Sequence, residues 1–386
     1  MSRLVTSMRQ WRTGLRLHAS FVLVASVASV ASAALLVAPA ARGQTTTVVT
    51  LAPAAVVPVA PAEHEQVRPV LDKMAMIRVW FGDADRADQA MKVAMGELER
   101  VAGKLDANGR GSEVWTVNRA AGAEEVLVSQ ETHFLLQRSL DLCRITDGAF
   151  DITVKSFDYL WDFGRNPPVR PLPDEVRSRL AFAGCKLVAL KPDRIVRIMR
   201  PGVRISLDDV RGGQALERAA AALRRDGIEN FRIRIGGDIY VQGRTGTRHW
   251  YAAVPHPRDR ERTIAQLYLS SHAAATRSDS DSFFMKEGKR YHDVLDPRTG
   301  MPQDKVIQAT VISSDAVLAD GLSRAVFVLG PTKGIRLLDE TDQADGFLVD
   351  DKGLIHKSSG VDDFSRLPRR IDLRPSQTAR PEETAP

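Results

Sequence analysis

Apolar residues recur every three or four positions in three segments, a spacing that places them on one face of an α-helix. The first segment ends near Leu105, the second near Cys143, and the third near Gly227, a residue type that favours helix termination. The pattern predicts three amphipathic helices, built on Met91, Ala94, Leu98, Val101 and Leu105; Leu136, Leu140 and Cys143; and Leu216, Ala220 and Leu223.

Short runs rich in β-branched and aromatic residues predict strands over Phe231–Ile235, Ile239–Val241 and Ala309–Ile312. Two more helices are predicted over Ala319–Leu329 and Lys333–Leu338. No segment repeats with a period of about 20–50 residues, so a repeat architecture is not indicated. Helices and strands alternate without a strict βαβ rhythm, and the pattern predicts an α+β or α/β fold.

Composition is ordinary for a globular protein, with 386 residues, 44% hydrophobic and 26% charged. This length allows one large domain or two ordinary ones. Much of the formal charge of +6 lies in the first 16 residues and in the arginine-rich tail. Because no basic stripe is interleaved with aromatic residues, nucleic acid is not predicted as a partner.

Residues 1–41 are predicted to be a signal peptide. Four arginines between Arg3 and Arg16 precede the uncharged segment Phe21–Ala41, and Ala38-Pro39-Ala40 offers a small-x-small cleavage site. An uncleaved signal anchor is the alternative, because the apolar run is nearly long enough to span a membrane. No cysteine lies near the cleavage site, which excludes a lipid anchor on cysteine. The expected location is the periplasm or cell envelope.

The rest of the chain divides into a linker, a folded domain and a tail. Residues 42–68 are rich in Thr, Ala, Val and Pro and are predicted to be a linker. The folded domain is predicted over 69–368, and the Pro/Arg/Glu-rich residues 369–386 are predicted to be disordered. Cys143 and Cys185 could form a disulfide in an exported protein, although the sequence does not show whether they are close. Without CxxC or Cys/His clusters, a soft metal site is not predicted.

Three glycine-containing segments each allow a structural and a functional interpretation. In residues 146–154, followed by 160–164, Gly148 either ends a helix next to a core aromatic or lets the backbone approach a flat ligand. Gly212 and Gly213 open a predicted helix, which forms a plain junction or binds phosphate through free N–H groups. Asp238 follows a glycine turn and accepts hydrogen bonds from turn amides or from a ligand.

The fourth candidate site combines two segments. They are residues 291–300, Tyr-His-Asp-Val-Leu-Asp-Pro-Arg-Thr-Gly, and residues 319–323. Asp-Pro and Thr-Gly are turn signals, so the first part is predicted to be a tight loop that holds two carboxylates, a histidine and an arginine. Such loops often form functional sites, and a charged surface hairpin is the alternative. Asp320 either caps a helix or, together with backbone carbonyls, binds a hard cation such as Mg²⁺.

Taken in order, the motifs TDGAFD, LWDFG, GGDI, HDVLDPRTG and ADGLS resemble those of the ApbE family, the FAD:protein FMN transferases. Glu97–Arg100, Gly111–Val114 and Asn118–Gly122 also fit, and the resemblance covers about residues 74–345. It implies an α+β fold related to the T-fold, with mixed sheets packed with helices. It further implies an enzyme that binds FAD and Mg²⁺, transfers FMN to a Thr or Ser hydroxyl of an exported flavoprotein acceptor, and releases AMP.

By position, the resemblance assigns roles to residues of this chain. Asp293 and His292 are the catalytic candidates, and Asp320 and Arg324 take the metal-binding positions. Contacts to the flavin nucleotide are assigned to Met74, Ala149, Phe150, Asp151, Asp208, Arg211, Asp238 and Asp296.

Several positions depart from the family pattern. The family reads Asp-Leu-Gly-Gly-Ile-Ala-Lys-Gly where this chain has residues 206–213, so the family's lysine falls on Gly212 and a metal-binding carbonyl on Arg211. The family's Ala-Thr-Ser-Gly-Asp-Tyr becomes residues 275–280, with Arg277 in place of serine. The family's histidine falls on Asp293, and its metal-binding threonine falls on Arg324.

A guanidinium beside a cation site opposes metal binding, because two unit charges about 4 Å apart interact by roughly 4 kcal/mol at an effective dielectric constant near 20. Mg²⁺ is therefore a doubtful cofactor. Two hypotheses follow. In the first, the chain is an active transferase in which Arg324 or Arg211 replaces the metal in charge neutralisation. In the second, it is a catalytically degenerate relative that binds flavin or a partner protein without transfer.

Overall fold

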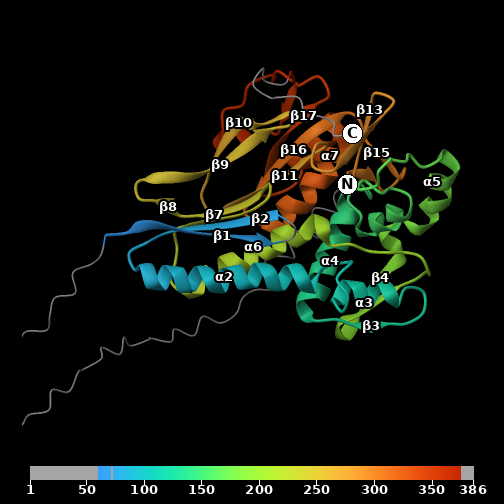
Figure 1. Cartoon of the computed structure of the whole chain (residues 1–386), viewed down its shortest axis with the longest axis horizontal. Coiled ribbons are helices and arrows are strands. Elements are labelled where there is room, and N and C mark those ends of the chain that lie inside the picture. Colours follow the sequence, from blue (N-terminus) through green and yellow to red (C-terminus); the bar gives the residue numbers. More distant parts are fainter. Residues whose placement is uncertain (1–59, 71–72, 375–386) are drawn as a thin grey trace, which may run out of the picture. The chain divides into compact units, whose positions relative to one another are not determined.

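The computed structural model describes residues 60–70 and 73–374, all of which belong to one compact unit (Figure 1). The predicted signal peptide, most of the predicted linker and residues 375–386 of the predicted tail lie outside the described residues. Within the described part, no helix has both the length and the apolar character needed to cross a membrane.

An eight-stranded sheet forms the centre of the fold, and each pair of neighbouring strands is antiparallel. Its central strand β16 is buried at every position because both faces of the sheet are covered. In spatial order the strands are β1 (Ala62–Val70), β2 (Lys73–Phe81), β6 (Phe231–Ile235), β7 (Asp238–Gln242), β11 (His272–Ser278), β16 (Val306–Ser313), β17 (Ala344–Asp350) and β18 (Ile355–Lys357).

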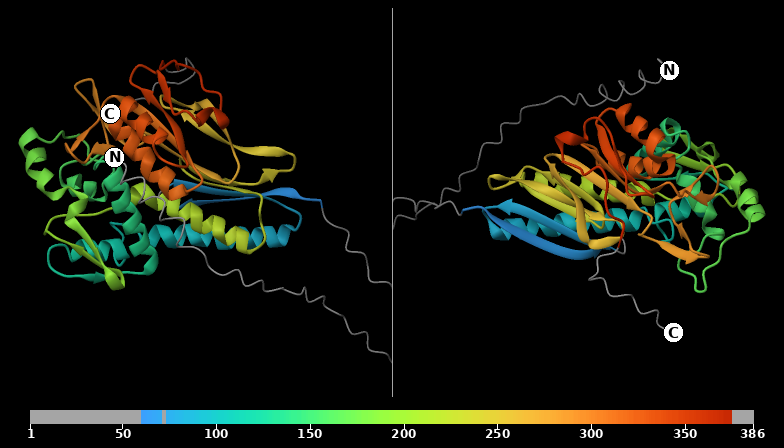
Figure 2. Two further views of the ribbon diagram at one scale, coloured as in Figure 1. Left: turned by 180° about the vertical axis from the view of Figure 1, so that it is seen from behind. Right: turned by 90° about the horizontal axis from the view of Figure 1, so that it is seen from above.

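Three helices pack against one face of this sheet: α2 (Ala84–Lys104), α6 (Asp208–Arg225) and α7 (Ala316–Asp339) (Figure 2). Their apolar faces and that side of the sheet form the larger core, in which Leu98, Leu216 and Phe327 are almost completely buried. Burial of a side chain of this size stabilises the fold by about 1.5–3 kcal/mol. Two of the predicted amphipathic helices, those ending near Leu105 and Gly227, are confirmed as α2 and α6, since their apolar positions face this core. The third is α4 (Gln130–Ile145), in which Leu136 belongs to this core.

The opposite face of the sheet carries the long hairpin of β9 (Arg248–His256) and β10 (Asp259–Leu269), with β8 (Arg244–Thr245) at its edge (Figure 1). A second core lies beneath it and includes Trp250 and Leu267. Strand β7 shows the alternation expected of a sheet between two cores, because Ile239 and Val241 face the hairpin while Tyr240 faces the helices.

The remaining elements lie at one end of the helical layer (Figure 1). They include a three-stranded sheet, two short hairpins and the 3₁₀ helix η2 (Ile152–Tyr159). Their bounds are α3 (Glu113–Arg119), β3 (Val126–Leu127), α4 (Gln130–Ile145), α5 (Pro173–Arg179), β4 (Val188–Lys191), β5 (Ile195–Ile198), β12 (Phe283–Lys286), β13 (Lys289–His292), β14 (Leu295–Asp296) and β15 (Met301–Pro302).

The folded region extends beyond the predicted bounds 69–368 at both ends. Strand β1 begins at Ala62, inside the predicted linker, and pairs along its whole length with β2. Its side chains are mostly polar and exposed, so no hydrophobic pattern marks it in the sequence. At the other end, Ile371 is buried in the second core and its N–H donates to the carbonyl of Gly353 over 2.9 Å.

Two helix predictions in the second half need different adjustments. The predicted helices 319–329 and 333–338 are the two parts of α7, which changes direction where Gly330 has a φ of 78° before Pro331. The prediction that Gly212 and Gly213 open a helix is wrong, because α6 begins at Asp208 and both glycines lie within it. Both positions need a small residue because α7 and β7 pack closely against them.

Candidate functional site

Three carboxylates from three elements converge on the guanidinium of Arg277, which projects from β11. Asp238 at the start of β7 lies 3.3 Å from Arg277 Nη1, and Asp209 in α6 lies 3.8 Å from Nε. Asp320 in α7 contacts Nη2. The side chains of Arg277, Asp238 and Asp320 are 12%, 6% and 1% exposed, so water can do little to solvate these charges. We call these four residues the acid cluster.

Glycines allow the three elements to come this close. A Cβ atom on Gly213 would lie 2.3 Å from the carbonyl oxygen of Ala316, so only glycine lets α6 pack against the start of α7 at this point. A Cβ atom on Gly212 would lie 2.9 Å from Asp238 Oδ2 and 3.2 Å from Asp320 Oδ2. The two glycines therefore serve close packing around the acid cluster and not the open end of a helix.

Asp320 is held inside α7 and does not cap it. The capping residue is Asp315, whose side chain accepts a hydrogen bond from the backbone N–H of Leu318. Asp320 Oδ2 accepts from the backbone N–H of Gly213 over 2.8 Å, and Oδ1 accepts from Arg277. Burial raises the pKa of Asp320, and the guanidinium of Arg277 opposes that shift.

The charge on Arg277 is secured by its partners. Burial alone disfavours the charged guanidinium, but Asp320, Asp238 and Asp209 outweigh this effect and raise the pKa of Arg277. The cluster therefore contains a fixed positive charge that comes from the chain itself.

A second arginine connects the acid cluster to the predicted loop at residues 291–300. Arg324 lies one helical turn beyond Asp320, and its Nη1 and Nε lie 3.2 and 3.1 Å from the two carboxylate oxygens of Asp209. Its Nη2 donates to the backbone carbonyls of Asp293 and Leu295 over 3.3 and 3.4 Å. The side chain is 8% exposed. Arg324 therefore fixes the position of the loop relative to the acid cluster.

The two catalytic candidates occupy different environments. His292 is buried; its Nε2 lies 2.7 Å from the carbonyl oxygen of Gln303, and burial lowers its pKa. Asp293 is exposed, although the protein around it removes part of its hydration. That desolvation, opposed by Arg324, raises the pKa of Asp293 to about 6, and access to water limits how far the effect can act. Asp293 is therefore the candidate that reactants can reach.

The second half of the loop is closed by its own contacts. Asp296 accepts two side-chain hydrogen bonds from Arg298, each 2.8 Å long. Trp161 Nε1 donates to the carbonyl of Gly300 over 2.9 Å. Gly300 has a φ of 69°, and a Cβ atom there would lie 2.6 Å from the ring of Phe157, so glycine is required. Asp296 thus has a structural partner in the loop.

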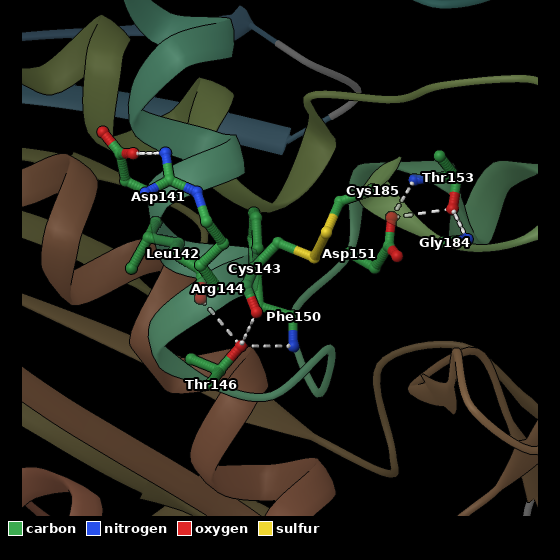
Figure 3. Close-up of a disulfide and its surroundings, with 10 residues drawn as sticks. All are labelled: Asp141, Leu142, Cys143, Arg144, Thr146, Phe150, Asp151, Thr153, Gly184 and Cys185. Carbon is green, nitrogen blue, oxygen red and sulfur yellow. Dashed lines mark hydrogen bonds and ion pairs between the residues drawn. A yellow bond between two sulfur atoms is a disulfide. The ribbon is translucent and has the colours of Figure 1, made fainter. Parts of the chain in front are cut away.

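The predicted flavin contacts Ala149, Phe150 and Asp151 have buried side chains, and Figure 3 shows the last two beside the end of α4. Phe150 belongs to the larger core, and Asp151 Oδ1 accepts from the N–H and hydroxyl of Thr153 over 2.8 and 2.7 Å. Burial raises the pKa of Asp151. Gly148 ends α4 as predicted, with a φ of 73° and a hydrogen bond from its N–H to the carbonyl of Cys143. The three assignments stay predictions.

A disulfide joins Cys143 at the end of α4 to Cys185, which lies 42 residues further along the chain (Figure 3). Among the described residues, the sole group of three potential ligand side chains within 4.8 Å of one another consists of these two cysteines and Asp151. Because the two sulfurs are bonded to each other, this group is not a soft metal site.

Comparisons with known proteins place these residues in a family. The sequence matches the ApbE family over residues 71–348. The chain belongs to the ApbE family. It is similar to the FAD:protein FMN transferase of Vibrio cholerae, with 29% identity over 248 residues, which are 63% of this chain and 74% of that protein. A second relative of the same name, from Klebsiella pneumoniae, is 28% identical over 266 residues, which are 68% and 83% of the two chains.

Solved structures agree with this assignment. The crystal structure of the ApbE protein from Thermotoga maritima has a TM-score of 0.73 and 29% identity and covers 79% of this chain and all of that one. The flavin transferase ApbE from Vibrio cholerae has a TM-score of 0.71; at 24% identity over 79% of this chain and 99% of that one, it shows the fold alone. The predicted family and α+β fold are confirmed.

Three further residues assigned by family position, Met74, Asp208 and Arg211, also lie outside the acid cluster. Arg211 points toward α2, pairs with Asp208 at 2.8 Å and donates to the carbonyl of Ala102 over 3.3 Å. Met74 lies in β2 with an exposed side chain. Residue 211 therefore lies on the side of α6 that faces α2, and the hypothesis that Arg211 replaces the metal in charge neutralisation stays a prediction.

A Mg²⁺ ion does not fit the side chains at the family's metal position. Mg²⁺ takes oxygen ligands at about 2.0–2.1 Å in octahedral geometry. Both oxygens of Asp320 already accept hydrogen bonds, from Arg277 and from Gly213. The other predicted metal position is Arg324, whose guanidinium offers no lone pair.

The central residue of the cluster, Arg277, was not among the predicted site residues. A signal for it exists in the sequence, because Arg277 is the one charged residue of β11, His-Ala-Ala-Ala-Thr-Arg-Ser. A lone arginine among small residues of a central strand indicates a buried partner of opposite charge. The sequence does not show that three partners come from α6, β7 and α7.

Proposed function

We propose that this chain is an FAD:protein FMN transferase that modifies an exported flavoprotein acceptor in the periplasm or cell envelope. The observation that carries the proposal is the family match over residues 71–348, in a family whose curated relatives bear this name. The Cys143–Cys185 disulfide supports an oxidising compartment, since such bonds are uncommon in the cytosol.

In the proposed reaction, a Thr or Ser hydroxyl of the acceptor attacks the phosphorus atom of FAD that carries the riboflavin group. The new oxygen–phosphorus bond forms as the phosphoanhydride bond breaks, and AMP leaves with the bonding electron pair. The hydroxyl proton passes to a base. Asp293 is our candidate for that base, because it is exposed and its pKa of about 6 suits proton transfer near neutral pH.

The residues around Asp293 have supporting roles in this proposal. Arg324 holds the backbone at Asp293 and Leu295 and supplies a fixed positive charge near the base. Such a preorganised charge stabilises negative charge that develops on a pyrophosphate during transfer. We assign His292 a positioning role, because its contact with the Gln303 carbonyl anchors the strand that leads into Asp293.

The test is covalent labelling. The mature protein is incubated with FAD and an acceptor flavoprotein, and protein-bound FMN is measured by in-gel fluorescence and intact mass, with the Vibrio cholerae relative as positive control. Asp293→Asn should lower the transfer rate by about 100-fold or more, since general bases contribute about 10²–10⁴-fold. FAD affinity should stay within about threefold.

Asp304→Asn is the matched control, because this carboxylate is 68% exposed and pairs only with Lys289 in the described structure. It should leave the transfer rate unchanged. Saturable FAD binding by the unmodified protein without labelling of the acceptor would contradict the proposal and favour the catalytically degenerate alternative.

A further inference from the structure

The acid cluster has a cation at its centre that cannot easily leave. Arg277 contacts Asp320, Asp238 and Asp209, which belong to three different elements, and its side chain is only 12% exposed. To vacate this position, the guanidinium would have to give up three carboxylate partners at once. Asp238 and Asp320 would then remain buried without a counter-ion, which is strongly unfavourable, and Asp209 would keep only its pairing with Arg324.

The charges in and around the cluster alternate in sign. Arg277 lies between Asp238 and Asp320, and Asp209 lies between Arg277 and Arg324, which also contacts the Asp293 and Leu295 carbonyls. A divalent ion in this position would face two guanidinium groups as well as the carboxylates. Because like charges repel strongly where water is excluded, the ion would be opposed by charges that the fold holds in place.

In this chain α6 presents no cation to the cluster, because the residue that faces Asp238 and Asp320 is Gly212. The positive charge comes instead from the strand on the other side, where Arg277 provides it.

We propose that Arg277 is a built-in replacement for a divalent metal ion, so that the cluster of Asp209, Asp238 and Asp320 is organised by a guanidinium and binds no divalent cation. Arg277 is then a positioning residue that holds α6, β7 and α7 in the arrangement on which Arg324 and the Asp293 loop depend. One consequence rests on the proposed function: transfer of FMN by this chain requires no added divalent ion.

The direct test is a titration of the metal-free protein with Mn²⁺, followed by electron paramagnetic resonance and calorimetry. We expect the unmodified protein to have no Mn²⁺ site at Asp320, so Asp320→Asn should leave its Mn²⁺ binding unchanged. Arg277→Ser opens the cluster and should create such a site, with at least a tenfold gain in Mn²⁺ affinity and a rise in Tm on adding Mn²⁺. In the double variant Arg277→Ser/Asp320→Asn, both gains should disappear.

Arg258→Ser is the matched control, because Arg258 is another partly buried arginine but pairs with the single carboxylate of Asp279, at 2.5 and 2.7 Å. Removing it exposes no cluster of carboxylates, so it should create no Mn²⁺ site. A similar gain of affinity in this control would overturn the proposal, since any lost arginine would then suffice.

Mn²⁺ binding to the unmodified protein tests the proposal even if Arg277→Ser does not fold. A Mn²⁺ site in the unmodified protein that Asp320→Asn removes is incompatible with the proposal. Arg277→Lys, which keeps the charge, should also show no gain in Mn²⁺ affinity, and a gain there would count against the proposal.

Transfer assays keep the two proposals separate. Labelling of the acceptor that persists in EDTA within twofold supports both. Labelling that EDTA abolishes and Mg²⁺ restores supports the proposed function and overturns the role of Arg277. If no labelling occurs with or without Mg²⁺, the proposed function fails, and the Mn²⁺ titration still tests the role of Arg277.

Discussion

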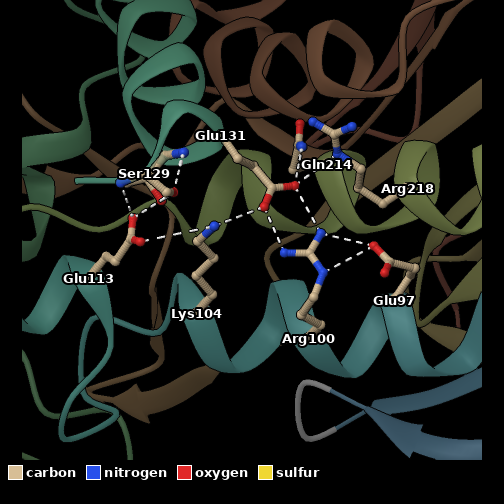
Figure 4. A network of polar contacts seen from close by, with 9 residues as sticks. Glu97, Arg100, Lys104, Glu113, Ser129, Glu131, Gln214 and Arg218 are labelled. Carbon is tan, nitrogen blue, oxygen red and sulfur yellow. Dashed lines mark hydrogen bonds and ion pairs between the residues drawn. The ribbon is translucent and has the colours of Figure 1, made fainter. Parts of the chain in front are cut away.

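Two charged clusters of this protein have opposite composition. In the acid cluster, one cation, Arg277, serves three carboxylates. In a second cluster, one carboxylate, Glu131 at the start of α4, serves three cations (Figure 4). Its distances to Arg100, Lys104 and Arg218 are 2.7, 3.1 and 2.8 Å.

The two clusters differ in how far water solvates their excess charge. Around Glu131, the side chains of Arg100, Lys104 and Arg218 are 40%, 23% and 44% exposed, so water solvates their charges. Arg100 also pairs with Glu97, and Lys104 with Glu113. Arg100 holds the pKa of Glu131 well below its usual range. In the acid cluster the excess is negative and buried, and burial raises the pKa of Asp320 instead. An ion cluster can thus be either a solvated surface feature or a buried constraint, and exposure decides which.

The largest expected effect is that of Arg277→Ala, which should lower the free energy of unfolding by about 3–5 kcal/mol, because it leaves buried carboxylates without their counter-ion. Urea denaturation at pH 7.5 measures the loss. Arg218→Ala removes a cation from the exposed cluster and should lower it by at most about 1 kcal/mol. Similar losses in both variants would erase the distinction between the clusters.

The loss of unfolding free energy on removing the disulfide is a reference value for the losses expected at the two clusters. Cys143→Ser/Cys185→Ser opens a loop of 42 residues, and the expected loss of unfolding free energy is about 4 kcal/mol. Urea denaturation of the double variant, compared with the unmodified protein with and without a reductant, gives the value. We expect it to be close to the loss for Arg277→Ala and well above that for the exposed cluster; a loss below that of the exposed cluster would show that the bond adds little.

The two clusters should also differ in pH dependence. Carboxyls whose pKa is raised in the folded state bind protons that the unfolded chain releases, so their folded form gains stability as pH falls toward their ordinary pKa. The loss caused by Arg277→Ala should therefore shrink between pH 8 and pH 5, by about 1–2 kcal/mol. Denaturation at both pH values measures this change, and a loss that grows at pH 5 would contradict the assignment of charges.

A small effect, about 1 kcal/mol, is also expected for Glu131→Gln, because the three cations that contact Glu131 keep access to water. Because the pKa of Glu131 is lowered, its contribution is present above its ordinary pKa and persists between pH 8 and pH 5. The loss should fall by about half between 0.05 and 0.5 M NaCl, since salt screens exposed charges. The loss for Arg277→Ala should depend on salt much less, and an equal salt dependence would show that water reaches both clusters.

The sequence predicts the parts of the fold that rest on local patterns. The apolar spacing of Leu98 in α2 and of Leu216 in α6 correctly marks the faces that meet the sheet. Strand β1 escapes prediction because an edge strand with polar side chains has no hydrophobic period. The interpretation of Gly212 as a helix opening fails because the sequence does not contain the positions of Asp238 and Asp320, and these decide what fits beside it.

The candidate site is predictable only in part for the same reason. Asp320 and Arg324 were located by family position, and the structure places both at the acid cluster or beside it. Arg211 was expected there as well, but helix geometry turns it toward α2. The packing of β11 against α7 decides which arginine neutralises the carboxylates. These elements are far apart in the sequence, so no local pattern predicts that arginine.

Gly212 and Arg277 lie against the same two carboxylates, Asp238 and Asp320. The family pattern described above has lysine at the first position and serine at the second, so in this chain the positive charge lies on a strand and not on a helix. Gly212→Lys alone would give these two carboxylates a second cation, whereas Arg277→Ser alone would leave them with none. The two substitutions should therefore be epistatic, because the effect of each on stability depends on the residue at the other position.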